Sequence, residues 1–166
     1  MIRDFNNISP QIHETAFIAP NSTVVGNVIL GANTTIWYNA VLRGDIDSIV
    51  VGDNTNIQEG CILHCKTGVG IEIGSNVTIG HGAILHSCNI GNNTLIGMGA
   101  IILDDSKIGN NCLVAAGSVV TSRTEIPDGS LVVGSPAKVK RVLTEQEITD
   151  IKSNANEYIN LLKYYK

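Results

Sequence analysis

The chain has 166 residues, of which 43% are hydrophobic, 16% charged and 4% aromatic, and its formal net charge is −4. This composition fits one globular domain, excludes a disordered chain or a coiled coil, and argues against nucleic acid or an anionic membrane as partner. Because it has only four cysteines, no apolar run near the ~20 residues of a membrane span and no signal-peptide core, we expect a reduced, cytoplasmic protein.

Aliphatic residues recur at every sixth position along most of the chain. The longest unbroken series has eight members and runs from Ile90 to Val132. A six-residue period predicts a short strand and a turn in each repeat, and three repeats form one coil of a triangular parallel β-helix with an aliphatic column inside. Glycine follows the aliphatic position at seven places, which predicts tight corners. The series breaks at residues 43–50 and 64–72, which we expect to loop out.

The C-terminal part of the chain departs from the repeat. Gly134–Ala137 is predicted to turn out of the solenoid, whose open sheet edge needs a cover. Thr144 and Glu147 form a capping-box pattern ahead of apolar residues at helical spacing, which predicts one helix over residues 145–165 packed back on the coils. The corresponding division is a β-helix domain over residues 1–142 and a helical segment over residues 143–166.

Three of the four histidines lie where the repeat is irregular. When each irregular stretch is collapsed into one repeat, three leucines become equivalent positions in successive coils, and the residues that follow them are Arg43, His64 and His86. These three residues should therefore stack in one column. Neighbouring parallel strands lie about 4.8 Å apart, which is close enough for two stacked imidazoles to bind one metal ion.

His81 falls one repeat earlier in the coil, so we expect it on a different face of the prism from His64 and His86. One chain would then not unite the three imidazoles, whereas a three-fold trimer of parallel prisms would place His81 of one chain opposite the pair of its neighbour. Three neutral imidazoles and a water make the open tetrahedral arrangement of a catalytic zinc. The alternative interpretation is three surface histidines that happen to fall in adjacent coils.

Polar side chains near the histidines have two interpretations each. Asn56 and Gln58 lie about one coil from the level of His81, where an amide could orient a water and a polar substrate or could be an ordinary turn residue. Arg43 and Asp45 could form a bidentate ion pair across the proposed interface, or a solvated surface pair.

Cys61 and Cys65 flank His64 in a C-x-x-H-C pattern, which raises the question of metal ligation by thiolates. Strand alternation points Cys61 inward or toward a corner, and it places Cys65 on the opposite side of the strand from His64. We therefore favour core positions for both, with Cys65 as a minor candidate ligand.

Arg43-Gly44-Asp45 and the segments Asn56–His64 and Gly80–His86 resemble motifs of the γ-class carbonic anhydrase family. The resemblance extends from Ile12 to the terminal helix. It implies a left-handed parallel β-helix assembled as a homotrimer, and reversible hydration of CO2 to bicarbonate at zinc, with Fe(II) or cobalt as alternative metals. The roles that it implies are metal ligation by His64, His81 and His86, pocket contacts by Asn56, Gln58 and Tyr158, and subunit contacts by Arg43 and Asp45.

The chain departs from the archaeal members of that family in its acidic residues. Those members carry a carboxylate directly after the R-x-D motif and another in the loop after the first histidine. Here Ile46 and the carboxylate-free segment 65–70 occupy these places, and Glu59 is the nearest carboxylate in sequence. Because the departure concerns the release of protons from the site, we expect any CO2 hydration to be slow.

Three other functions compete with this one. Hexapeptide acyltransferases share the β-helix, and Gly134–Lys138 resembles the segment that they use near coenzyme A, whose phosphates Lys138, Lys140 and Arg141 could meet. Such enzymes need one histidine as a general base and no metal. A thioesterase acting at the same zinc site is the second alternative, and a metal-stabilised trimer without catalysis is the third.

Overall fold

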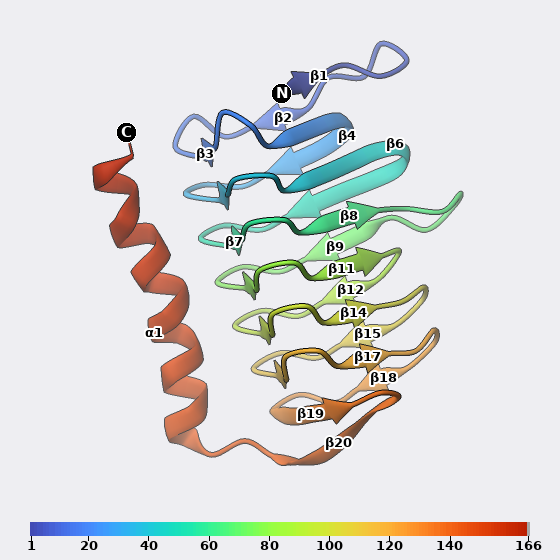
Figure 1. Cartoon of the computed structure of the whole chain (residues 1–166), viewed down its shortest axis with the longest axis vertical. Helices are drawn as coiled ribbons and strands as arrows, with labels where there is room; N and C mark the ends of the chain where they lie inside the picture. Colours follow the sequence, from blue (N-terminus) through green and yellow to red (C-terminus); the bar gives the residue numbers. More distant parts are fainter. Residues whose placement is uncertain (166) are drawn as a thin grey trace.

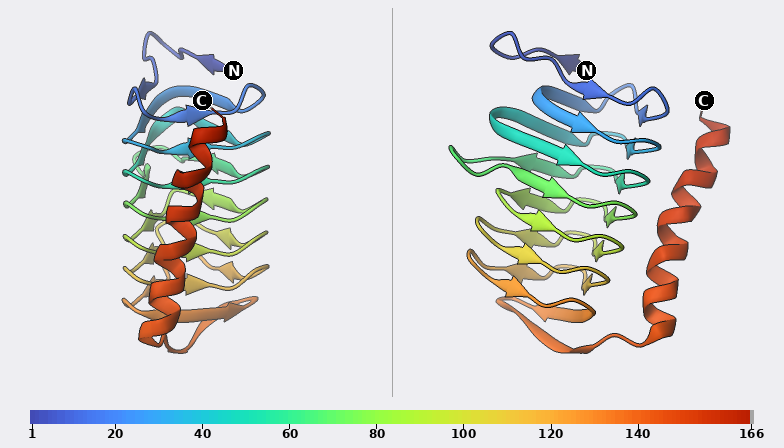
Figure 2. Two further views of the ribbon diagram at one scale, coloured as in Figure 1. Left: turned by 90° about the vertical axis from the view of Figure 1, so that its left-hand side faces the viewer. Right: turned by 180° about the vertical axis from the view of Figure 1, so that it is seen from behind.

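The computed structural model describes residues 1–165 and shows a parallel β-solenoid with one α-helix along its side (Figure 1). The coils stack as a prism, and the helix runs from the last coils back towards the first (Figure 2). The predicted left-handed β-helix with a C-terminal helix is confirmed. Within residues 1–165, no helix has the length and apolar character that a bilayer crossing requires.

Three rows of strands form the three faces of the prism, and within a row each strand pairs in parallel with its equivalents in neighbouring coils. Face 1 consists of β1 (Ile2–Arg3), the first parts of β4 (Thr23–Leu30) and β6 (Val41–Val51), β8 (Ile62–His64), β11 (Ile84–His86), β14 (Ile101–Ile102) and β17 (Val119–Val120). Face 2 consists of β2 (Gln11–Ile12), the second parts of β4 and β6, β9 (Ile71–Ile73), β12 (Asn89–Ile90), β15 (Lys107–Ile108) and β18 (Glu125–Ile126). Face 3 consists of β3 (Phe17–Ile18), β5 (Thr35–Ile36), β7 (Asn56–Ile57), β10 (Thr78–Ile79), β13 (Leu95–Ile96), β16 (Leu113–Val114) and β19 (Ser130–Gly134).

The aliphatic column predicted from the six-residue period fills the prism. All eight members of the series from Ile90 to Val132 are at most 6% exposed. Strand pairing sets Ile90 beside Ile108 in the next coil, so equivalent positions of the repeat stack on one another. Each inward side chain therefore packs between the same kind of residue above and below.

The two irregular stretches differ from each other. The prediction that residues 43–50 loop out is wrong, because β6 continues without a break through eleven residues and turns the corner from face 1 to face 2. It pairs with β8 at one end and with β9 at the other, so both of its ends are hydrogen-bonded to the next coil. After β8 the chain does leave the coil, in a narrow loop that Lys66 and Val69 close by an antiparallel bridge.

Glycine at the corners has a different cause from the expected one. A Cβ on Gly52 would lie 2.7 Å from the carbonyl carbon of Gly74, and one on Gly91 would lie 2.6 Å from that of Gly109. The left-handed backbone that a corner needs is instead adopted in many coils by an asparagine, such as Asn54 with φ +58°. The glycine after each aliphatic residue therefore marks the close approach of the next coil.

The end of the solenoid carries a strand that the sequence did not predict. Residues 134–137 turn back tightly instead of leaving the coils, and β20 (Ala137–Val142) pairs antiparallel with β19. This added strand covers the last open edge of face 3. At the other end, β1 and β2 add an incomplete coil ahead of the first predicted repeat.

The C-terminal helix α1 (Glu145–Leu161) begins at the predicted capping box, in which Thr144 and Glu147 each accept a backbone hydrogen bond of the other. The helix ends earlier than predicted, because the chain tightens into the 3-10 turn η1 (Leu162–Tyr164). Ile151 and Ala155 are buried against face 3, which confirms that the helix packs back on the coils. Lys166, the last residue of the predicted helical segment, lies outside the described residues.

The close approach of neighbouring coils at the corner glycines leads to a prediction about stability. We expect Gly91→Asn to lower the free energy of unfolding by about 2–3 kcal/mol, because its Cβ would push against the main chain of the next coil. Gly68→Asn is the matched control: Gly68 has φ +79° with no atom within 4 Å of a Cβ, and asparagine tolerates that backbone, so the change should stay within about 0.5 kcal/mol. Urea unfolding of both variants measures the difference, and equal losses would contradict the steric explanation.

Candidate metal centre

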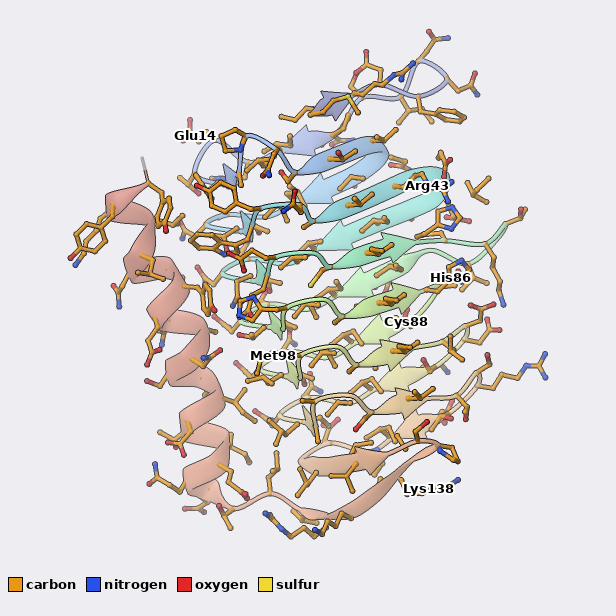
Figure 3. All side chains as sticks on the ribbon, viewed as in Figure 1. Glu14, Arg43, His86, Cys88, Met98 and Lys138 are labelled. Atoms are coloured by element: carbon orange, nitrogen blue, oxygen red, sulfur yellow. The ribbon has the colours of Figure 1, made fainter. Side chains whose placement is uncertain are left out.

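His64 and His86 end the strands β8 and β11, which are neighbours in face 1. The register pairs His64 with His86 and Arg43 with His64, so the predicted column of three residues is confirmed. Figure 3 shows Arg43 and His86 on the same side of the solenoid. The imidazoles stand beside each other at the corner between faces 1 and 2, with 3.2 Å between His64 Nδ1 and His86 Nε2.

A carboxylate contacts the outer nitrogen of each of these two rings. Asp45 Oδ1 lies 3.2 Å from His64 Nε2, and Asp104 Oδ1 lies 2.5 Å from His86 Nδ1. An ionised carboxylate only accepts hydrogen bonds, so each outer nitrogen carries the proton of its ring. The two inner nitrogens, which face each other, are then both left with a lone pair.

Both carboxylates are held in their ionised form. Burial is the largest single influence on Asp45 and would raise its pKa, but the hydrogen bond from Arg43, at 2.6 Å, the charge of Arg43 and the hydrogen bonds with the backbone and His64 together lower that pKa. The hydrogen bond with His86 is the main cause of the lowered pKa of Asp104. Burial, with the nearby charge of Arg43, lowers the pKa of His64 and favours the neutral imidazole that a metal requires.

The separation of the inner nitrogens fits a shared metal ion. Two neutral nitrogen lone pairs that face each other at 3.2 Å repel unless a cation or a proton lies between them. For tetrahedral zinc with Zn–N bonds of about 2.0–2.1 Å, two ligand nitrogens are about 3.3 Å apart. The distance between these two nitrogens would therefore suit two ligands of one tetrahedral ion.

His81 lies at the opposite edge of face 1 from this pair. It lies in the turn between β10 of face 3 and β11 of face 1, whereas His86 ends β11. The prediction that His81 lies outside the column of His64 and His86 is therefore confirmed, with His81 at a corner of the prism and not within another face. Its Nδ1 is 2.7 Å from Glu59 Oε2, and its backbone N–H donates to Gln58 Oε1. Within residues 1–165, no three histidine, cysteine or acidic side chains come together as a metal site.

The amides expected near His81 belong to a hydrogen-bonded chain that reaches the helix. Gln58 donates to the Asn56 side-chain oxygen, and Asn56 donates to the Thr78 hydroxyl. The Thr78 hydroxyl in turn donates to Asn154 of α1. Gln58 and Asn56 are both buried, so this chain fixes the orientation of their amides beside His81. The helix thus takes part in positioning that edge of the site.

A groove of about 450 Å³ lies between face 3 and α1 and opens beside His81. Tyr158 lines it, as the family resemblance implied, and burial raises the pKa of this tyrosine. The ring of Tyr158 also packs edge-on against Trp37, with 5.8 Å between centroids. The rest of the lining is mostly apolar and includes Leu95, Met98, Leu113 and Ala115.

The cysteines point into the core. Cys61 and Cys65 are buried, and burial raises the pKa of each thiol to about 11. Each thiol contacts a backbone carbonyl, that of Gly80 for Cys61 and that of Ser48 for Cys65. Protonated thiols in such places are packing residues, so the core interpretation fits better than thiolate ligation.

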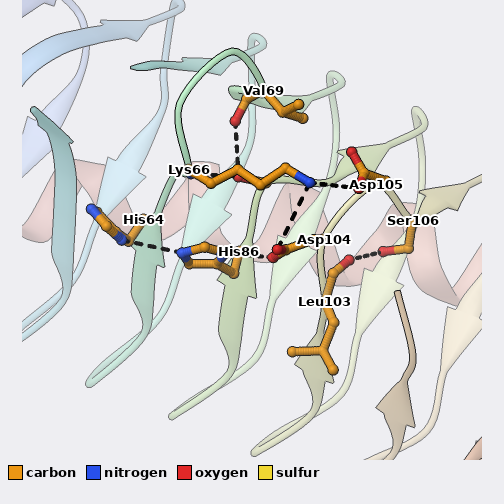
Figure 4. Close-up of polar contacts among 9 residues, drawn as sticks. His64, Lys66, Val69, His86, Leu103, Asp104, Asp105 and Ser106 are labelled. Atoms are coloured by element: carbon orange, nitrogen blue, oxygen red, sulfur yellow. Dashed lines mark hydrogen bonds and ion pairs between the residues drawn. The ribbon is translucent and has the colours of Figure 1, made fainter. Parts of the chain in front are cut away.

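Sequence reasoning missed Asp104 and Lys66. Asp104 lies one coil beyond His86, and Lys66 extends from the loop after His64 towards it; Figure 4 shows both beside the imidazole pair. The register pairs Leu85 with Ile102, so Leu103 is the equivalent of His86 in the next coil and Asp104 lies one residue beyond it. The repeat could therefore have indicated that Asp104 is near His86, but not the contact itself. The position of Lys66 depends on the path of an irregular loop, and no pattern in the sequence predicts it.

Three comparisons relate this arrangement to known proteins. The model of the bacterial transferase hexapeptide family (six repeats) matches residues 9–44 and 87–122. A probable carbonic anhydrase of Methanocaldococcus jannaschii is 49% identical over 158 residues, which are 93% of this chain and 99% of the relative. A carbonic anhydrase of Geobacillus kaustophilus is 48% identical over 166 residues, which are 100% of this chain and 91% of the relative.

Solved structures with this fold include proteins that are described as transferases. The crystal structure of a putative acetyltransferase from Bacillus cereus matches with a TM-score of 0.97 at 40% identity and covers 99% of this chain and 95% of that one. The repeats and the fold define a hexapeptide-repeat protein. Given the identity to its relatives over nearly the whole length, the chain belongs to the γ-type carbonic anhydrase family.

The state of the thiols can be measured directly. We expect the native protein at pH 8 to react slowly with a thiol reagent, because all four cysteines are buried and free and the pKa of each thiol is raised. Unfolding in urea should release four reactive thiols. Rapid reaction of one thiol in the native protein would contradict the core assignment.

Proposed function

We propose that the protein is a zinc-dependent carbonic anhydrase that hydrates CO2 reversibly at the three interfaces of a homotrimer in the cytoplasm. The observation that carries the proposal is the imidazole pair, in which His64 and His86 present two lone pairs 3.2 Å apart at the edge of face 1. His81 of a neighbouring chain would be the third ligand. Imidazole ligands suit zinc, Fe(II) and cobalt, and zinc is the metal that three histidines and a water hold in other hydratases.

The outward side chains of the three faces support the trimer. On face 2 they are mostly polar, including Glu72, Asn89 and Lys107, and α1 covers face 3. Face 1 carries instead an aliphatic ladder, in which each member is the register partner of the next: Val41, Ile62, Ile84, Ile101 and Val119.

In the single chain, two members of the aliphatic ladder are exposed and the other three are half-buried. Ile62 is 46% exposed and Ile84 is 37% exposed, although both are large apolar residues. A contiguous apolar row of this kind is typical of a protein interface. The ladder lies between the His81 edge and the His64–His86 edge, so packing face 1 of each chain into a closed ring would bring opposite edges of neighbouring chains together.

The chain's own residues would then divide the work of hydration. Zinc, when bound, supplies a water whose pKa is lowered to about 7. Gln58 and Asn56, whose amides are fixed by hydrogen bonds, would orient a polar molecule beside His81. Glu59, half-exposed and in contact with His81, would be the carboxylate that passes a proton to solvent. Ile46 occupies the place where archaeal members of the γ class carry an acidic residue.

A second candidate function is favoured by the groove beside His81. At about 450 Å³ it is much larger than the three atoms of CO2 require, and its apolar walls suit an acyl chain. Hydrolysis of an ester or thioester at the same zinc would use it. The acyltransferase interpretation has less support, because Arg141, one of its proposed phosphate contacts, is paired at 2.7 Å with Glu147 of the helix.

Metal analysis and two assays test these functions. We expect about one zinc per chain, and CO2 hydration by stopped flow that is slow and accelerates with added imidazole buffer. Protein without metal that transfers acyl groups would establish the transferase instead. Zinc-loaded protein that cleaves thioesters but leaves CO2 unchanged would establish the hydrolase, and zinc-loaded protein inert in both assays would leave a structural trimer.

The aliphatic ladder makes a prediction about assembly. Ile84→Glu would bury a carboxylate in the interface, so we expect a folded monomer that has lost tight zinc binding. Asn89→Glu places the same residue at an exposed strand position on face 2 and should remain a zinc-loaded trimer. Native mass spectrometry reports both states. A wild-type monomer with bound zinc would show that the site lies within one chain.

Mixed trimers test the division of the site between chains. His81→Ala and His64→Ala should each give metal-poor, inactive homotrimers. When they are co-expressed, about three-quarters of trimers are mixed, and each has one interface that joins an intact His81 to an intact His64–His86 pair. About a quarter of wild-type zinc and activity should therefore return. The double variant co-expressed with wild type calibrates random mixing, and no recovery in proven mixed trimers would refute the shared site.

A further inference from the structure

We propose that Asp104 is a positioning residue of the metal site: its carboxylate holds His86 by Nδ1, so that Nε2 faces His64 with its lone pair. Lys66 lies at ion-pair distance from the other oxygen of Asp104. The inference rests on the zinc site of the proposed function and assigns a role to a carboxylate and a lysine from outside the histidine motifs.

The contact with His86 selects one tautomer of its ring. Asp104 Oδ1 lies 2.5 Å from His86 Nδ1, and both side chains are about one-third exposed. A proton fixed on Nδ1 leaves Nε2 free to bind a metal, and it also fixes the rotation of the ring. Carboxylates that accept the distal N–H of a ligating histidine have this effect in many metal sites.

The second oxygen of Asp104 faces a cation. Lys66 Nζ lies 3.9 Å from Asp104 Oδ2 and 2.5 Å from Asp105 Oδ2. The backbone N–H of Lys66 donates to Ser87 Oγ, and that hydroxyl donates to the Val69 carbonyl, so the loop itself is tied to the next coil (Figure 4). The loop that lacks carboxylates therefore supplies the charge that orients Asp104.

The same arrangement occurs one coil away, at His64. There Oδ1 of Asp45 contacts the imidazole, and Oδ2 of Asp45 accepts a hydrogen bond from Arg43. At both coils one carboxylate oxygen contacts the outer nitrogen of a histidine while the other oxygen faces a cation, at 2.6 Å for Arg43 and at 3.9 Å for Lys66. Two histidines aligned in this way point their inner nitrogens at one place, which a surface ion pair alone would not explain.

Three variants test the role of Asp104. Asp104→Ala removes the acceptor, and Asp104→Asn keeps an oxygen of the same shape without its charge. Asp105→Asn is the matched control, because Asp105 contacts Lys66 but not His86, and asparagine tolerates its φ of +61°. Circular dichroism and native mass spectrometry establish that each variant keeps the fold and assembly of the wild type.

The first measurement is the tautomer of His86 in metal-free protein, read from long-range nitrogen–proton NMR spectra of the imidazole. We expect a proton on Nδ1 in the wild type and in Asp105→Asn. In Asp104→Ala we expect a shift towards the Nε2–H form that free histidine side chains favour. Wild-type protein with the proton of His86 on Nε2 would overturn the inference.

The second measurement is zinc affinity by competition with a chromophoric chelator. We expect about a 10–100-fold loss in Asp104→Ala, a smaller loss in Asp104→Asn, and a change within about 2-fold in Asp105→Asn. Equal affinity of wild type and Asp104→Ala would overturn the role of Asp104 and leave the proposed function intact. A wild type that binds no zinc would defeat the proposed function, and the tautomer would still decide whether Asp104 orients His86.

Discussion

Every feature of the site depends on the register in which one coil stacks on the next. Parallel pairing brings residues of successive coils to the strand spacing, so a histidine in one coil meets a histidine in the next. The same spacing leaves no room for a Cβ at Gly52 or Gly91, and it stacks aliphatic residues in the core. A shift of one residue would turn the core outward and separate His64 from His86.

Charge and hydrogen bonding refine what the register brings together. The imidazole pair is useful to a metal only if its protons lie on the outer nitrogens, and Asp45 and Asp104 hold them there. At the His81 edge, the Glu59 carboxylate contacts the imidazole, and two buried amides add a chain of hydrogen bonds that ends on α1. A carboxylate therefore contacts the histidine at both edges of face 1, and buried amides are added at the His81 edge.

The three faces differ in the polarity of their outward side chains and in what covers them. The polar face 2 meets solvent, and face 3 receives the helix and its aromatic contacts around Trp37. Face 1 keeps a partly exposed aliphatic ladder between the two halves of the site. Assembly and catalysis would therefore share one surface in the proposed trimer, because the contact that buries the ladder also completes the ligand set.

The sequence by itself determined the solenoid, the aliphatic core, the pairing of His64 with His86, the separate position of His81 and the capped helix. The repeat predicts most of these features, because the place of a residue in the solenoid depends on its position within the six-residue period. The helix follows from a local capping motif and helical spacing of apolar residues. The tertiary structure decided those features that a residue's position in the six-residue repeat does not predict. The unbroken course of β6, the hairpin of β20 and the reach of Lys66 to Asp104 depend on how irregular segments find hydrogen-bond partners in neighbouring coils. The path of such a segment depends on its contacts with the surface of the neighbouring coils, and that surface forms only when the coils stack.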